Sequence, residues 1–177
     1  MEYAGFWRRF GAYWIDVLIW IPIGILMVWL GGLNKYVYIS LLLPNLIIGV
    51  WFHVYLVKKY GGTPGKLLMK IKITKIDGSP VGYREAMIRY SVLFALAILS
   101  TIAMVIAMSN MPSEEYYSLG WKARSLRLIQ YTPFWYAWVD LFTNVWVWSE
   151  FVVMLTNKQR RSVHDFMAGT IVIKSAS

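Results

Sequence analysis

The chain has 177 residues, of which 58% are hydrophobic and 15% charged, with a formal net charge of +9 and no cysteine. A soluble domain of this length seldom combines so many apolar residues with so few charges, and a chain without cysteine has neither disulfides nor thiolate metal sites. We therefore expect an integral membrane protein with several spanning helices.

Four stretches are long and apolar enough to span a membrane. Each approaches the roughly 20 residues that cross about 30 Å of hydrocarbon at about 1.5 Å per residue. Segments such as 41–57 are apolar all round, which excludes a soluble helical bundle with a wet outer face. The predicted spans are residues 10–30, 38–57, 88–108 and 133–156.

The basic residues are distributed unevenly between the segments that flank these spans. Fourteen lie at the N-terminus, in the region between the second and third spans, or after the fourth span, whereas four lie in the opposite segments. This bias predicts that both termini, the loop 58–87 and the tail 157–177 are cytoplasmic. Because the charges adjoin spans, anionic membrane lipids are the expected partners, and nucleic acid is not.

The cytoplasmic segments carry signals for a small folded cap. Residues 70–83 alternate apolar and polar side chains around an Asp77-Gly78 turn, which predicts a hairpin, and residues 169–174 predict a strand that joins it. Ser162 and Asp165 have capping-box spacing for a short helix that ends at Gly169. The outer loop 109–132 is expected to form a helix in the membrane interface.

The fold class is thus an all-α membrane protein of one domain, residues 1–177, with four transmembrane helices and a small cytoplasmic strand-rich cap.

Motifs for enzyme chemistry are weak. The segment 61–68, GGTPGKLL, resembles a phosphate loop, but it is one residue short and has Leu67 in place of the magnesium-binding Ser or Thr. The histidines, His53 and His164, lie far apart in the sequence and form no evident set with a serine or an aspartate. We expect no enzymatic activity, no cofactor and no metal site.

Three segments resemble the RDD family of small bacterial and archaeal membrane proteins, which is named for an arginine and two aspartates. They are residues 4–16 (AGFWRRFGAYWID), 61–73 (GGTPGKLLMKIKI) and 161–173 (RSVHDFMAGTIVI), in the family's order. The resemblance implies that Arg9, Asp16 and Asp165 are the three named residues. It also implies a multi-pass protein of the prokaryotic cytoplasmic membrane and a role in transport, with cation/proton antiport proposed for some members.

Ionisable side chains within spans usually face a bundle interior or a wet cavity. Counted from the cytoplasmic ends of their spans, Asp16 and Glu150 lie about 9 Å deep and His53 about 6 Å deep at the helical rise. The depths predict one inner layer of binding or protonation groups. The sequence gives the depth of each residue but not the rotation of its helix, so their convergence in the plane of the membrane is an inference. A second, outer layer is expected from Asn45, Asp140 and Asn144.

Arg9 and Asp16 lie seven residues apart, about 700° around a helix, so they share one face two turns apart. Because helical side chains lean toward the N-terminus, a direct bridge between them is not expected. The proposed partner of Arg9 is Asp165, a pairing that would hold the tail to the first span. Two simpler alternatives stay open: Asp16 as a hydrogen-bond anchor for helix packing, and Asp165 as a helix cap alone.

These observations favour a transporter of a small ion or solute, working as a homo-oligomer because four spans make a thin bundle for a pathway. The rival hypothesis is a non-transport membrane adaptor or assembly factor whose basic cap binds lipid or a protein partner.

Overall fold

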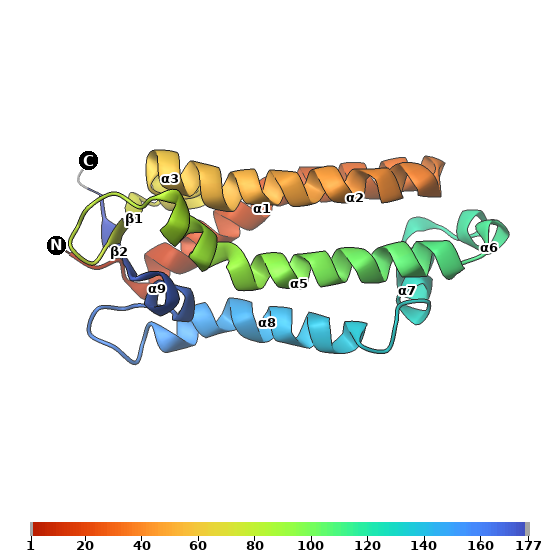
Figure 1. Ribbon diagram of the computed structural model, residues 1–177. Helices are drawn as coiled ribbons and strands as arrows, with labels where there is room; N and C mark the ends of the chain where they lie inside the picture. Colours follow the sequence, from red (N-terminus) through yellow and green to blue (C-terminus); the bar gives the residue numbers. More distant parts are fainter. Residues whose placement is uncertain (1, 176–177) are drawn as a thin grey trace.

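The computed structural model describes residues 2–175, and four long helices dominate it (Figure 1). They are α1 (Phe6–Leu33), α2 (Lys35–Val50), α5 (Tyr83–Asn110) and α8 (Tyr136–Val153). The helices lie along one common axis, and both chain ends lie at the same end of the bundle. That end also carries the sheet, and we call it the cap end.

Shorter elements close the two ends of the bundle. A π-helical stretch, η1, and α3 continue α2 without a break, while α6 and α7 lie at the end opposite the cap (Figure 1). Their bounds are η1 Trp51–Tyr55, α3 Leu56–Tyr60, α4 Pro64–Leu68, β1 Ile71–Lys75, α6 Ser113–Ser118, α7 Trp121–Gln130, α9 Val163–Ala168 and β2 Thr170–Lys174.

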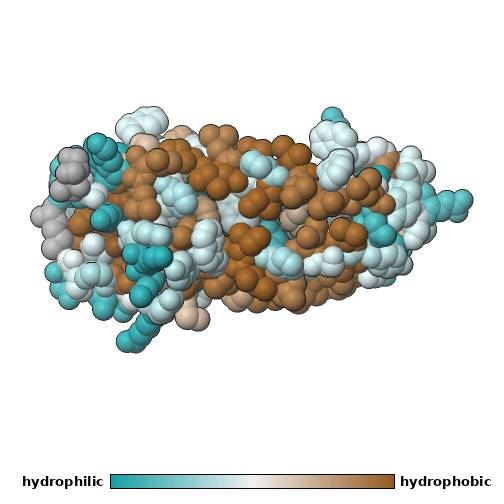
Figure 2. All heavy atoms as spheres, turned by 90° about the horizontal axis from the view of Figure 1, so that it is seen from above, coloured by the Kyte–Doolittle hydropathy of each residue, from teal (hydrophilic) through white to brown (hydrophobic). Residues whose placement is uncertain are grey.

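Three helical stretches within residues 2–175 are long and apolar enough to cross a membrane: Phe6–Leu33, Lys35–Leu68 and Tyr83–Asn110. The fourth predicted span corresponds to α8, which has 18 residues but is not among the three. It contains Asp140, Asn144 and Glu150 among its apolar residues. On the face drawn in Figure 2, hydrophobic side chains cover the middle of the bundle and hydrophilic ones lie at both ends, the distribution expected of a membrane protein.

The sheet differs from the predicted hairpin. β1 pairs antiparallel with β2, with Ile71 opposite Lys174, so the prediction that the tail strand joins the sheet is confirmed. The prediction of a return strand is wrong. After the turn at Gly78, the pairing is limited to a single bridge between Thr74 and Pro80. Proline has no N–H to donate to a ladder, which limits pairing at this point.

The short helix in the tail follows its prediction. α9 begins after Ser162, whose capping box with Asp165 is complete, and ends at Gly169 in a left-handed conformation with φ of 64°. The helix therefore has a fixed start and a fixed stop, and it holds Asp165 in its first turn.

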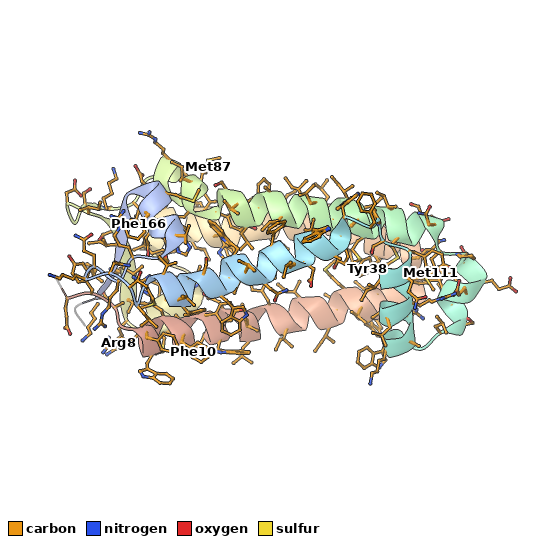
Figure 3. The ribbon with its side chains drawn as sticks, turned by 90° about the horizontal axis from the view of Figure 1, so that it is seen from below. Arg8, Phe10, Tyr38, Met87, Met111 and Phe166 are labelled. Carbon is orange, nitrogen blue, oxygen red and sulfur yellow. The ribbon has the colours of Figure 1, made fainter. Side chains whose placement is uncertain are left out.

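Two clusters of buried side chains hold the ends of the bundle. At the cap end, Ala12 and Tyr90 pack with Ile71 and Val172 of the sheet. At the opposite end, Met111 packs with residues of α5, α6 and α7, close to Tyr38 (Figure 3). The cap is thus packed directly onto α1 and α5, which fixes the tail relative to the long helices.

Candidate functional site

Asp165 lies at the centre of a buried charge cluster. Arg9 Nη1 donates to Asp165 Oδ2 at 3.0 Å, and both side chains are fully buried. Arg89 of α5 pairs with Asp165 Oδ1. The structure thus brings together the two residues expected to hold the tail to α1 and adds Arg89, which sequence reasoning missed. Its position at the predicted inner end of a span was the available signal.

The carboxylate of Asp165 is also a helix cap. Its Oδ2 accepts from Ser162 N at 3.0 Å and Ser162 Oγ at 2.7 Å, and its Oδ1 accepts from Thr170 Oγ1 at 3.0 Å. Burial acts to raise the pKa of Asp165, but the charges of Arg89 and Arg9 outweigh it and hold the pKa well below its usual range. Capping and ion pairing therefore use one ionised carboxylate.

Asp16 joins α1 to the segment that resembled a phosphate loop. Its Oδ2 accepts from Thr63 Oγ1 at 2.5 Å, and its Oδ1 accepts from Gly65 N at 2.7 Å. A Cβ at Gly65 would lie 2.2 Å from the carbonyl oxygen of Ala12, so α4 approaches α1 as closely as only glycine permits. The anchoring interpretation of Asp16 accounts for both of its oxygens.

A cavity of about 200 Å³ lies at the cap end between α1, η1, α4, α5, α8 and α9. The predicted inner layer converges on it, since Asp16, His53 and Glu150 all line its wall. Lys66 and His164 line it as well and were not predicted as site residues. Lys66 falls in the second family-like segment and His164 adjoins Asp165, which were the signals that could have pointed to them.

The cavity side chains differ in how they are held. Glu150 Oε1 lies 3.7 Å from His164 Nε2, and that same nitrogen lies 3.0 Å from Ser162 Oγ. The His53 ring stacks on Tyr90, with centroids 4.7 Å apart. It belongs to the π-helical stretch η1, a geometry often found at functional sites.

The charges on the cavity wall are not all matched. Among residues 2–175, the Lys66 ammonium makes no ion pair within 4.0 Å. Within the same range, no group of three or more His, Asp or Glu side chains is arranged to hold a metal ion. The cavity is therefore small and mostly apolar, and its wall carries a carboxylate-histidine contact and one cation without an ion-pair partner.

The predicted outer layer does not assemble within the described chain. Asp140 and Asn144 are exposed on α8, where Asn144 Nδ2 donates to the Asp140 carbonyl at 2.9 Å. Asn45 lies on α2, and no side-chain hydrogen bond joins it to either residue in the described part of the chain. Depth was a poor guide here because the rotation of α8 turns its two polar groups outward.

His164 should make stability depend on pH. Burial, followed by the charge of Arg89, lowers its pKa to about 4, against about 6.5 in an unfolded chain. Between these values the unfolded chain binds a proton that the folded chain does not, so the free energy of unfolding falls as pH drops. We expect a loss of about 3 kcal/mol between pH 7 and pH 4, measured by denaturant unfolding in detergent micelles.

The variant His164→Gln should lose this component of the pH dependence. A wild-type unfolding free energy that stays constant between pH 7 and pH 4 would contradict a neutral, buried His164.

The sequence of the chain matches one known protein family. The family model described as RDD family matches residues 3–169, nearly the whole chain, including the cavity-lining residues and the Asp165 cluster. No curated protein and no solved structure matches the chain.

Proposed function

Because the chain belongs to the RDD family, we propose that it moves a small ion or solute across the prokaryotic cytoplasmic membrane through the cap-end cavity. One observation carries the proposal: Asp16, His53 and Glu150, from three different helical segments, line one cavity. Titratable groups at membrane depth are costly and usually mark ion or proton pathways.

The contacts indicate different roles for the carboxylates of Asp16 and Glu150. Both oxygens of Asp16 accept hydrogen bonds from Thr63 and Gly65, so we assign this side chain to holding α4 against α1. The Glu150 carboxylate lies 3.7 Å from the His164 ring and faces the cavity. A cation bound to the Glu150 carboxylate and a proton on it exclude each other by charge, which is the requirement for cation/proton antiport.

The proposed topology has four spans. α8 has 18 residues, about 27 Å at the helical rise, which approaches the thickness of the hydrocarbon core. It packs against α5 along the bundle, where a fourth span would lie (Figure 1). The basic cap would then face the cytoplasm together with both termini.

A homo-oligomer would cover the polar groups that α8 exposes. Asn144 lies near the middle of α8 and Asp140 about one turn from its start at Tyr136. An aspartate facing lipid costs up to about 2.5–3.5 kcal/mol, the value at a helix centre. An amide and a carboxylate one turn apart can form hydrogen bonds with the same pair on a second copy. We therefore place α8 at the interface between protomers.

Cysteine cross-linking tests this interface in a chain that has no cysteine of its own. A cysteine at Leu141, exposed beside Asn144, should form a disulfide-linked dimer in native membranes under mild oxidation, because two α8 helices meet there. Ile102→Cys, exposed on α5, is the matched control and should stay monomeric. Equal cross-linking at both positions, or none at Leu141, would place the interface elsewhere.

Flux measured in proteoliposomes tests the proposed function. The purified protein alone should move Na⁺, K⁺ or Li⁺ when a pH gradient is imposed, and protein-free liposomes should not. The rival function, a membrane adaptor or assembly factor that acts through its basic cap, predicts no flux under any of these conditions.

A further inference from the structure

A second cleft opens at the cap end, between the start of α1 and the segment that follows α8. Its volume is about 790 Å³, and its lining includes Trp7, Arg8, Leu155, Lys158 and Arg160. Figure 3 shows Arg8 at this end of α1, on the cap side of Phe10. The cleft is separate from the transport cavity, and no lining residue is shared between them.

The charge of this cleft is strongly positive. Four of its lining residues are cations and one, Glu2, is an anion that pairs with Lys174. In the described residues, the side chains of Arg8, Lys158 and Arg160 make no ion pair within 4.0 Å. Three cations without an ion-pair partner outnumber the one carboxylate of the cleft, and this excess of positive charge provides a site for an anion.

The fold holds one of these cations in place. Arg160 has a left-handed backbone with φ of 51°, and its carbonyl oxygen accepts from Arg9 Nη2 at 2.6 Å. The buried arginine that pairs with Asp165 therefore also fixes the loop that carries Arg160. Gly5 leaves room for the guanidinium, since a Cβ there would lie 2.6 Å from Arg160 Nη1.

The cleft also carries exposed apolar side chains. Trp7 is 77% exposed and Leu155 is 67% exposed, beside the unpaired cations. Large apolar side chains next to basic ones are typical of the boundary between acyl chains and headgroups. The helix α1 starts at this boundary, and no side chain caps its first N–H groups.

We propose that this cleft binds the headgroup of an anionic phospholipid. The phosphate is held by Arg8, Lys158 and Arg160, while the acyl chains lie along Trp7 and Leu155. The three cations favour a lipid with a net negative charge over one whose own ammonium group would meet them. The inference rests on the proposed placement of the cap end at the membrane surface, and it is independent of what the transport cavity carries.

Native mass spectrometry of the purified protein in detergent tests the site. Phosphatidylglycerol and phosphatidylcholine with identical acyl chains are each added to the wild-type protein. The phosphatidylglycerol adduct should be retained at least tenfold more than the phosphatidylcholine adduct. The triple variant Arg8→Gln, Lys158→Gln, Arg160→Gln should lose at least tenfold of the phosphatidylglycerol adduct.

A matched variant removes three charges from the same end of the molecule, outside the cleft. Lys70, Lys72 and Arg84 are exposed and do not line the cleft, so the triple change of these residues to Gln should alter the adduct less than twofold. If the cleft triple variant fails to fold, Arg8→Gln with Lys158→Gln leaves Arg160 in place and should still lose at least threefold.

Three outcomes would overturn the proposal. Equal losses in the cleft and control variants would show general surface attraction, and equal retention of the two lipids would show no recognition of charge. Loss of the lipid adduct on addition of millimolar inorganic phosphate would show that the site takes the free ion. Failure of transport would leave the adduct intact, so this test and the flux test fail separately.

Discussion

Replacing Asp165 by asparagine should lower the free energy of unfolding by about 3–5 kcal/mol, because two buried guanidinium groups lose their shared counter-charge. Arg9 and Asp165 are fully buried and Arg89 is nearly so. Asparagine has nearly the same shape as aspartate, so the lost free energy of unfolding reflects the removed charge and not a change in side-chain volume. Denaturant unfolding in detergent micelles at pH 7 provides the measurement.

A double-mutant cycle tests whether Asp165 and its arginine partners form one coupled cluster or a set of independent contacts. Arg89→Met alone should cost less than Asp165→Asn, because Arg9 still pairs with the carboxylate at 3.0 Å. Combining the two changes should cost less than the sum of the single losses, since the second change removes a charge that the first left unpaired. Glu114→Gln, at an exposed site, is the control and should change little. Strict additivity, or a loss below about 1 kcal/mol in Asp165→Asn, would contradict a coupled buried cluster.

Replacing Gly65 by alanine should cost at least about 2 kcal/mol, because overpacking at a close backbone contact forces elements apart. The new Cβ would lie 2.2 Å from the Ala12 carbonyl oxygen and 2.8 Å from Asp16 Oδ1. Relief requires α4 to move away from α1, and this movement lengthens the bond from Gly65 N to Asp16. The loss should appear in the same unfolding assay.

Gly24→Ala is the matched control for this prediction. A Cβ at Gly24 meets nothing within 4 Å, and Gly24 lies inside α1. Alanine should leave stability unchanged or raise it by up to about 1 kcal/mol, the difference in helix propensity. Equal effects of alanine at Gly65 and Gly24 would show that α4 is not held closely against α1.

Counting residues along the predicted spans grouped some side chains that the fold brings together, but it gave no information on helix rotation. Asp16, His53 and Glu150 were placed in one layer by counting residues from the span ends, and they line one cavity. The same counting placed Asp140 and Asn144 in an outer layer, but both are exposed on α8. Rotation depends on which neighbours a helix packs against, and that information is distributed over the whole chain.

Partners of buried charges were only partly predictable. The need to satisfy a buried arginine pointed to Asp165 for Arg9, and the two side chains are in contact. Arg89 was counted as a cytoplasmic charge because its sequence neighbours gave no sign that the cap folds back over α5. The contact depends on α9 packing against α5, which is a tertiary arrangement.

The roles of short segments also depended on tertiary contacts. The segment 61–68 could be excluded as a phosphate loop from its spacing. Its role as the hydrogen-bond donor to Asp16 of α1 appears only in the folded structure, where Gly65 N meets the carboxylate. The hairpin prediction treated Pro80 as part of a return strand, although it lacks the N–H that a ladder needs.

The most direct test of the account is the pH profile of cation flux in proteoliposomes for the wild type, Glu150→Gln and Asp16→Asn. The account predicts flux in the wild type and loss of its pH dependence in Glu150→Gln, because the exchanging carboxylate is gone. Asp16→Asn should keep the wild-type profile, since an amide can still accept from Gly65 N and donate to Thr63 Oγ1. Absence of flux in a correctly inserted wild type, or an unchanged profile in Glu150→Gln, would contradict transport through this cavity.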